Sequence, residues 1–217
     1  IFIRINMSYK GYLVEENNGV FTSSIKNIEV PKIESNSVII KVHYSSLNYK
    51  DALAATGAKG VVKSYPFIPG IDVAGEVIES TSSKFKIGDN VIATGYKIGM
   101  SVFGGFGEIV HLPDNWVVMM PKELDFLTSM SYGTAGLTAA ACIKKITDAK
   151  CTDKLPVIVS GSSGGVGSVA IGILSKIGYE VHALTGKTSH EETLKEMGAK
   201  KILDRTQFMS DPVKALD

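Results

Sequence analysis

The chain has 217 residues, which is enough for one large domain or two small ones. Hydrophobic residues make up 44% and charged residues 21%, a balance typical of a soluble globular protein. Because 23 Lys and Arg face 22 Asp and Glu, the net charge is only +1, and the composition gives no support to nucleic acid or an anionic membrane surface as a partner.

The N-terminus and the cysteines bear on cellular location. Residues 1–6 are too short and too interrupted for the core of a signal peptide, so we interpret them as an upstream extension before a strand-like stretch that opens at Met7. No apolar run approaches the ~20 residues that cross a bilayer. Cys142 and Cys151 show no CxxC spacing and no neighbouring histidine cluster, so neither a disulfide framework nor a metal site is expected. These features predict a cytoplasmic protein.

The first half of the chain, from Lys10 to about Met120, consists of short β-type runs separated by Gly, Pro, Asn and Asp. The runs with the most β-branched character cover residues 38–44, 73–78, 90–93 and 116–120. Short strands at this spacing are typical of a small barrel-like β domain.

After residue 124 the pattern changes to alternating helices and strands. It predicts helices over 129–147, 166–177 and 190–197, and strands over 157–159, 179–184 and 201–203. The β-α-β-α-β order is the first half of a doubly wound parallel sheet, so the chain as a whole is of the α/β class. A complete fold of this kind has a second half, and we therefore expect the chain to be truncated at Asp217.

A Gly-rich turn, residues 160–167, lies between a predicted strand and a predicted helix. In that context the glycines let the backbone approach a pyrophosphate, and the helix N-terminus offers unpaired N–H groups and a partial positive charge. We expect the amides to come from the centre of the turn, Ser163, Gly164, Gly165 and Val166. The turn predicts a dinucleotide site.

The choice of dinucleotide depends on the end of the second strand of this half. An NAD site usually places Asp or Glu there, whereas an NADP site needs a hydroxyl or a cation. Here Thr185, Gly186 and Lys187 follow one another with no acidic residue. Thr185 could donate to a 2′-phosphate and Lys187 could neutralise its charge, or Lys187 could be a solvated surface residue. Arg205 either flanks the adenine ribose or lies free on the surface. NADP(H) is the favoured cofactor.

The same turn also fits Gly-x-x-x-Gly-x-Gly, the pattern of short-chain dehydrogenases, through Gly161, Gly165 and Gly167. Those enzymes carry the motif near the N-terminus and use a Tyr-x-x-x-Lys pair. Here the motif lies beyond residue 160, and no Tyr has a Lys four residues later. We reject that interpretation.

Several short motifs carry a resemblance to one family. They are SSLNYKDAL at 45–53, IPGIDVAG at 68–75, GDNV at 88–91, GGFGE at 104–108 and GTAGLTA at 133–139. Together with the Gly-rich turn they resemble the medium-chain dehydrogenase/reductase superfamily, in its zinc-free acrylyl-CoA reductase and quinone-oxidoreductase-like branch, from Met7 to about Phe208. The resemblance implies a GroES-like β-barrel catalytic domain over 7–128 and a partial Rossmann NADP-binding domain over 129–217.

The resemblance also bears on metal content. Metal-dependent members use a Cys in the first of these elements and a Gly-His-Glu in the second, where this chain has Asn48-Tyr49 and Gly70-Ile71-Asp72. The four-Cys structural lobe is missing as well, since the chain has only two Cys. We expect no zinc and no Lewis-acid mechanism.

By resemblance, NADPH delivers a hydride to the β-carbon of an activated double bond, such as that of an acrylyl-CoA-like enoyl thioester, and a protein group or water protonates the α-carbon. Tyr49 is then the candidate hydrogen-bond donor to the developing enolate, with Asn48 and Asp51 orienting it. Thr134 lies near the nicotinamide or simply caps a helix.

Other interpretations stay open. The acceptor could be a quinone or enone rather than a thioester, and the chain could be a non-catalytic NADPH-binding module, a sensor or an inactive remnant. The expected partner is a small molecule. A full-length form is expected to be a homodimer, because the family pairs subunits through a strand that this chain lacks.

Overall fold

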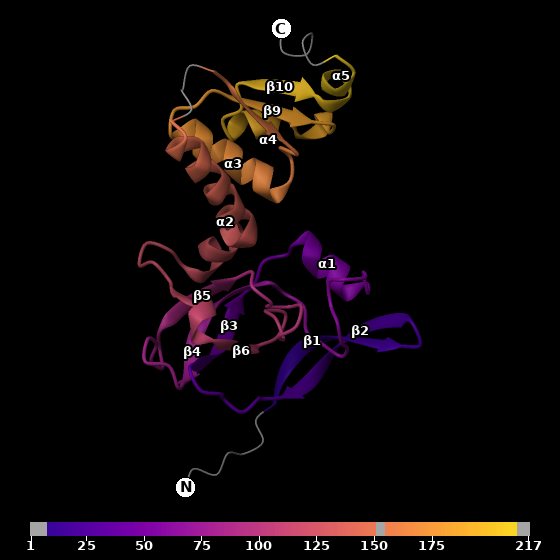
Figure 1. The fold of residues 1–217 in the computed structure, drawn as a ribbon, viewed down its shortest axis with the longest axis vertical. Helices are drawn as coiled ribbons and strands as arrows, with labels where there is room; N and C mark the ends of the chain where they lie inside the picture. The colour runs from indigo at the N-terminus through magenta and orange to yellow at the C-terminus, as the bar shows by residue number, and fades with distance from the viewer. Residues whose placement is uncertain (1–7, 151–154, 212–217) are drawn as a thin grey trace. The chain divides into compact units, whose positions relative to one another are not determined.

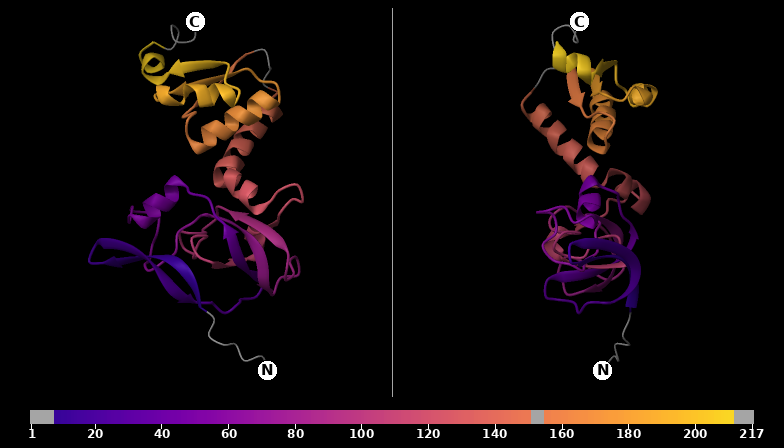
Figure 2. Two further views of the ribbon diagram at one scale, coloured as in Figure 1. Left: turned by 180° about the vertical axis from the view of Figure 1, so that it is seen from behind. Right: turned by 90° about the vertical axis from the view of Figure 1, so that its right-hand side faces the viewer.

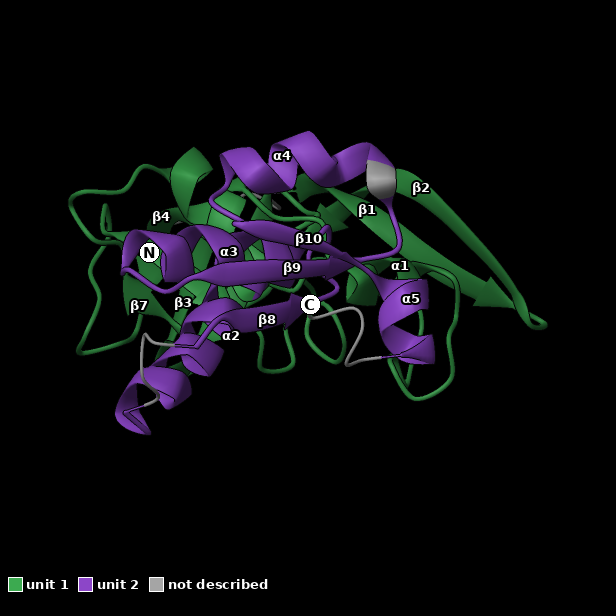
Figure 3. Cartoon of the chain, turned by 90° about the horizontal axis from the view of Figure 1, so that it is seen from above, with its two compact units in different colours: residues 1–134 green, residues 135–217 purple. Residues whose placement is uncertain are grey.

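The chain folds into two units. The structure, a computed structural model, describes residues 8–150 and 155–211, and its internal contacts separate residues 1–134 from residues 135–217 (Figure 3). The boundary lies inside helix α2 (Phe126–Asp148), which also contains the boundary expected at 128/129. Each unit has its own core, and each is described separately below.

Unit 1, residues 1–134, is built on a five-stranded antiparallel sheet with the order β6-β3-β4-β5-β7 (Figure 1). Its strands are β3 (Ser37–Tyr44), β4 (Asp72–Ser80), β5 (Asn90–Thr94), β6 (Ile109–Pro113) and β7 (Val118–Met119). A two-stranded hairpin, β1 (Ser8–Asn17) and β2 (Val20–Glu29), extends beyond this sheet in both Figure 1 and Figure 2. The predicted barrel-like β domain is confirmed in outline.

Strand β3 is buried on both faces, which explains why its sequence is apolar at consecutive positions. Val38 and Ile40 pack into the main core of the sheet, and Ile39 packs into a second cluster with Tyr9 and Leu13 of β1. All three β3 side chains are fully buried. Because side chains alternate between the faces of a strand, a strand covered on both faces reads as a continuous hydrophobic run.

The prediction of a strand over 116–120 is only partly correct. Residues before it form a short 3-10 helix, η1 (Asp114–Trp116), and only the two residues of β7 pair with β5. The Trp116 ring stacks on Tyr96 with 5.2 Å between centroids, and Trp116 also packs against the main core. The tight turn that carries Trp116 therefore replaces the start of the strand.

Unit 2, residues 135–217, has a parallel sheet with the order β10-β9-β8, and the three strands lie side by side in Figure 3. Its strands are β8 (Val157–Ser160), β9 (Val181–Thr185) and β10 (Lys201–Asp204), and its helices are α3 (Gly165–Lys176), η2 (Thr188–His190), α4 (Glu191–Glu196) and α5 (Arg205–Ser210). Ala139 and Ile143 of α2 pack with Ile171 and Leu174 of α3 in one core. The predicted β-α-β-α-β half is confirmed, and α5 is an addition to it.

Within the described ranges, no helix has the length and apolar character needed to cross a membrane.

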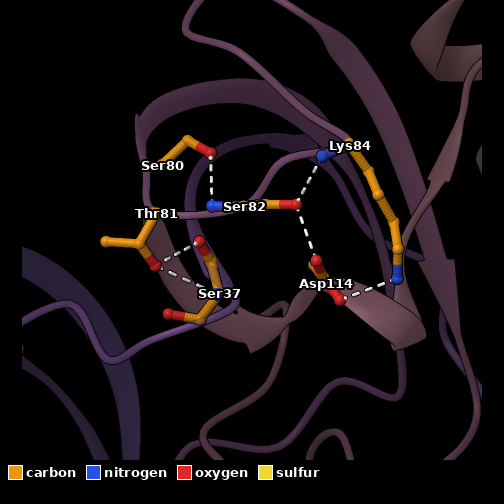
Figure 4. A network of polar contacts seen from close by, with 6 residues as sticks. All are labelled: Ser37, Ser80, Thr81, Ser82, Lys84 and Asp114. Carbon is orange, nitrogen blue, oxygen red and sulfur yellow. Dashed lines mark hydrogen bonds and ion pairs between the residues drawn. The ribbon is translucent and has the colours of Figure 1, made fainter.

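A polar network closes one end of the unit 1 sheet (Figure 4). The buried carboxylate of Asp114 accepts hydrogen bonds from Ser82 Oγ at 2.7 Å and Lys84 Nζ at 3.0 Å. Ser82 in turn receives the Lys84 N–H on its hydroxyl at 2.9 Å and donates its own N–H to Ser80 Oγ at 3.1 Å. The hydroxyl of Ser82, followed by the ammonium of Lys84, lowers the pKa of Asp114 below its ordinary value of 3.8.

We predict that Asp114→Asn lowers the midpoint of thermal unfolding at pH 7, since the charge that holds Ser82 and Lys84 is lost. A depressed carboxyl pKa contributes stability above the unfolded value and loses it as the pH falls through the folded value. The difference between the two proteins should therefore shrink below about pH 3.8. Thermal unfolding followed by circular dichroism across this range measures it, with Asp148→Asn, in an exposed ion pair, as the control. A difference that does not change with pH would contradict the assignment.

Candidate functional site

The most specific motif of the sequence forms a short helix, α1 (Tyr49–Ala55), which was not predicted. Asp51 fixes its start: the buried carboxylate accepts the backbone N–H of Asn48 at 2.8 Å, of Gly70 at 3.1 Å and of Ile71 at 3.0 Å. Burial raises the pKa of Asp51, although these N–H groups act in the opposite direction. Asp51 thus joins α1 to the segment before β4 and orients Asn48.

A second buried carboxylate lies at the first residue of β4. Asp72 is fully buried and accepts from the Asn48 side-chain amide at 2.8 Å, the Thr134 N–H at 3.0 Å and the Thr134 hydroxyl at 2.6 Å. It brings together two predicted site residues that are far apart in the sequence. Sequence analysis did not assign Asp72 a role, although its position in Gly-Ile-Asp, where metal-dependent relatives have an acidic residue, was a signal that could have found it.

The contact to Thr134 depends on a kink in α2. Gly133 has φ +47° and ψ −147°. This conformation lies outside the helical region, and its positive φ favours glycine. A Cβ at this position would contact the Ser46 hydroxyl and lie 2.6 Å from a carboxylate oxygen of Asp72. Next to the kink, the Thr134 amide donates to the Asp72 carboxylate at 3.0 Å.

Tyr49 differs from its neighbours in exposure. Its side chain is 82% exposed, whereas Asn48 is half-buried and Asp51 is buried. The first residue of α1 therefore presents a phenol to solvent from a backbone that is firmly held. Packing therefore does not fix the ring.

A hollow of about 470 Å³ opens beside Asn48. Its lining is mostly apolar and comprises Tyr12, Leu47, Asn48, Asp51, Ala52, Ala55 and Phe106. Asn48, Ala52 and Ala55 follow one face of α1, so one wall is polar at its start and carries only small methyl groups beyond it. Such a pocket suits a small apolar acceptor whose polar group is held near Asn48.

Unit 2 contains the Gly-rich turn, which runs from the end of β8 into α3. Gly161 has φ +59°, and its carbonyl accepts the Gly164 N–H at 2.9 Å. Gly164 is the N-cap of α3 and brings no side chain to its first amides. The first-turn N–H groups of Gly165 and Val166 are thus available to an anion, with Ser163 beside them.

The remaining predicted cofactor residues gather at the carboxyl ends of β9 and β10. The Thr185 hydroxyl accepts the Lys187 N–H at 3.1 Å and lies 3.5 Å from the Ser163 hydroxyl. The Arg205 guanidinium lies against Gly186, 3.2 Å from where a Cβ would be. Thr185 is buried, so it is better placed to orient Lys187 than to reach a ligand itself. Lys187 and Arg205 are exposed cations.

Among the residues that the structure describes, no group of three or more His, Cys, Asp and Glu is placed to hold a metal ion.

The chain is similar to known proteins, both in its first domain and over most of its length. Residues 34–122 match the alcohol dehydrogenase GroES-like domain. The chain is 40% identical over 197 residues to the "Probable acrylyl-CoA reductase AcuI" of Escherichia coli, covering 90% of this chain and 61% of that protein. It is 38% identical over 209 residues to the "Putative quinone oxidoreductase YhfP" of Bacillus subtilis, covering 96% and 63%. The chain thus spans about three fifths of the length of these relatives.

Solved structures agree. The yhdH oxidoreductase from Salmonella enterica in complex with NADP has a TM-score of 0.88 at 39% identity, over 92% of this chain and 62% of that one. Bacillus subtilis protein yhfP with NAD bound also has a TM-score of 0.88, at 37% identity, over 93% and 61%. The predicted fold class is confirmed by these likenesses.

We predict that Gly167→Ala destabilises the turn. A Cβ there would lie 2.5 Å from the Gly161 carbonyl oxygen and 2.7 Å from the Ser162 Cα, both backbone atoms that cannot rotate away. The expected loss is about 1–3 kcal/mol in the free energy of unfolding, measured by urea titration. Gly172→Ala in the same helix is the control, because its nearest neighbour is 4.0 Å away. It should gain about 0.5–1 kcal/mol; equal effects of the two substitutions would show that the turn is not tightly packed.

Proposed function

The chain belongs to the medium-chain dehydrogenase/reductase superfamily, and from this premise we propose that it is a metal-free, NADPH-dependent oxidoreductase that reduces an activated carbon–carbon double bond. The observation that carries the proposal is the combination of an open phosphate turn in unit 2 with an apolar pocket in unit 1 that Asn48 lines, next in the chain to the exposed phenol of Tyr49. Each unit supplies what one half of the reaction requires.

The residues of unit 2 fit a dinucleotide with a 2′-phosphate. The N–H groups of Gly165 and Val166, with Ser163 beside them, would hold the pyrophosphate at the N-terminus of α3. Gly164 donates its N–H to the Gly161 carbonyl and would contribute only close backbone approach. The residues at the end of β9, Thr185 to Lys187, include no carboxylate. Asp204, which pairs with Thr185 from β10, accepts the Gln207 N–H at 2.9 Å. Lys187 and Arg205 bring two positive charges to this edge, with Gly186 giving them room. The relative bound to NADP supports this choice, and the one bound to NAD makes the alternative dinucleotide worth testing.

When bound, the reduced cofactor would supply the hydride for the β-carbon of the acceptor. The chain's own part is to bind and polarise the acceptor. Asn48 lines the pocket and Tyr49 follows it in the chain. The carbonyl of an α,β-unsaturated compound would accept their hydrogen bonds as negative charge develops on its oxygen. Ala52 and Ala55 leave space for the hydrocarbon part. The proton for the α-carbon comes from Tyr49 or from water.

For the acceptor we propose an acrylyl-CoA-like enoyl thioester, which is supported by the name of the Escherichia coli relative. A quinone or enone is the second candidate, supported by the name of the Bacillus subtilis relative. Both are conjugated carbonyl compounds and use the same polarising groups. A module that binds NADPH without turnover is the alternative from another class.

We predict that Lys187→Ala lowers the affinity for NADPH about tenfold, the value of one charge-assisted contact, and leaves the affinity for NADH unchanged. Titration of cofactor fluorescence measures both. Lys176→Ala, an exposed lysine at the far end of α3, is the control. An equal loss for both dinucleotides would place Lys187 outside a 2′-phosphate site.

We predict that Tyr49→Phe lowers kcat for the reduction of acrylyl-CoA about tenfold to a hundredfold, because one donor to the developing oxyanion is lost. The readout is NADPH oxidation by absorbance, with acrylyl-CoA and a small quinone compared side by side. NADPH binding should be unchanged. If NADPH binds tightly and neither acceptor is reduced, the oxidoreductase proposal fails and a binding module remains. If Tyr49→Phe retains full activity, Tyr49 leaves the mechanism.

A further inference from the structure

Asp72 combines complete burial with contacts to two candidate site residues. Its carboxylate reaches the side chain of Asn48, 24 positions before it, and both the amide and the hydroxyl of Thr134, 62 positions after it. We infer that Asp72 is a positioning residue that sets which way Asn48 and Thr134 present their hydrogen-bonding groups to a ligand. The inference rests on the proposed function, in which Asn48 meets the acceptor.

The argument starts from what a carboxylate can do. An ionised carboxylate only accepts hydrogen bonds, so every neighbour must turn a donor toward it. Asn48 therefore directs its NH₂ group at Asp72, at 2.8 Å, and its amide oxygen points elsewhere. Thr134 donates its only hydroxyl hydrogen to Asp72, at 2.6 Å. The orientation of the Asn48 amide, which is otherwise free to flip, is thus fixed by charge.

These bonds to Asp72 determine which polar atoms of Asn48 and Thr134 can donate to a ligand and which can only accept. Thr134 Oγ1 has no hydrogen left and can meet a ligand only as an acceptor. The Asn48 side chain also takes part in the capping box with Asp51 at the start of α1, so its remaining polar atoms are oriented by that contact. Thr134 is therefore excluded as a donor to a developing oxyanion, which leaves that task to Asn48 and Tyr49.

The surroundings of Asp72 show why this arrangement is rigid. The backbone carbonyl of Asp72 also accepts the Ser45 hydroxyl at 2.7 Å, which holds the loop leading to Asn48. On the other side Gly133 lies so close to the Asp72 carboxylate that a side chain there would meet it. The carboxylate receives the first amide after the kink in α2, where the following helical turns place partial positive charge. Asp72 is held by the same groups that it orients.

A plain structural role is the competing explanation, and Asp72→Asn separates the two. The substituted amide has nearly the same shape, and its oxygen still accepts from Asn48 and the Thr134 amide. Its NH₂ group, however, faces Thr134 Oγ1 and must donate to it. The hydroxyl hydrogen of Thr134 then no longer points at residue 72, so Thr134 can donate to a ligand, while the packing is unchanged.

For Asp72→Asn we expect a melting temperature close to that of the unmodified chain, unchanged NADPH affinity, and a fall of roughly tenfold to a hundredfold in kcat with acrylyl-CoA. Thr134→Val should lower kcat as well, and the double variant should be no worse than Thr134→Val alone, because both changes act through one hydroxyl. Asp114→Asn, which also loses a buried carboxylate of unit 1, is the control and should lower the melting temperature without lowering kcat. Additive effects in the double variant, or full activity of Asp72→Asn, would overturn the inference.

A readout without turnover keeps this test separate from that of the proposed function. In two-dimensional NMR of the labelled chain, the Asn48 side-chain amide and the Thr134 backbone amide should both shift in Asp72→Ala and exchange faster with solvent. Asp114→Asn should leave both signals in place. If these signals do not respond to Asp72→Ala, Asp72 does not position them, whatever the enzymatic result. If they respond but no acceptor is reduced by the unmodified chain, the proposed function fails and the positioning role stands.

Discussion

A carboxylate that is removed from water must be surrounded by donors, and unit 1 is organised around two that are. Asp51 and Asp72 lie on either side of Gly70 and Ile71, and both accept from Asn48: one from its backbone, the other from its side chain. Losing any of these donors would leave a buried charge uncompensated, which costs far more than an ordinary hydrogen bond contributes. The position of Asn48 is thus among the most strongly determined in the unit.

Unit 2 differs from unit 1 in that the charged groups of its candidate site are exposed rather than buried. In the proposed function this unit has to attract an anion from water, which agrees with the exposure of its charged groups, Lys187 and Arg205, and with the backbone amides at the start of α3. Backbone dipoles need no side chain to hold them, which is why Gly164 and Gly165 suffice there. Buried carboxylates orient groups in unit 1, whereas the groups that would recruit a ligand in unit 2 are exposed cations and backbone amides.

The same contrast explains what could be predicted from the sequence. The turn after β8 and the alternation of strands and helices in unit 2 depend on neighbours a few residues apart, and both were predicted correctly. The role of Asp72 depends on contacts across 24 and 62 positions, which no local pattern encodes. Helix α1 was missed because it has only 7 residues and is held by Asp51 rather than by an apolar stripe. For Thr185, contact with a phosphate stays a prediction: its side chain is buried, and its hydroxyl oxygen accepts the Lys187 N–H.

The exposed position of Tyr49 follows from this division between fixed and unfixed groups. Polarisation of a carbonyl is effective when donors are preorganised, so that little reorganisation is needed as charge develops. Asn48 meets that condition without a ligand, because Asp51 and Asp72 already determine its backbone and its amide. Tyr49 meets it only in part: its Cα is fixed by the start of α1, but its ring is 82% exposed. Under the proposed function, the ring of Tyr49 would be fixed only by contact with a bound ligand, and the donor set would then be complete only when an acceptor is present.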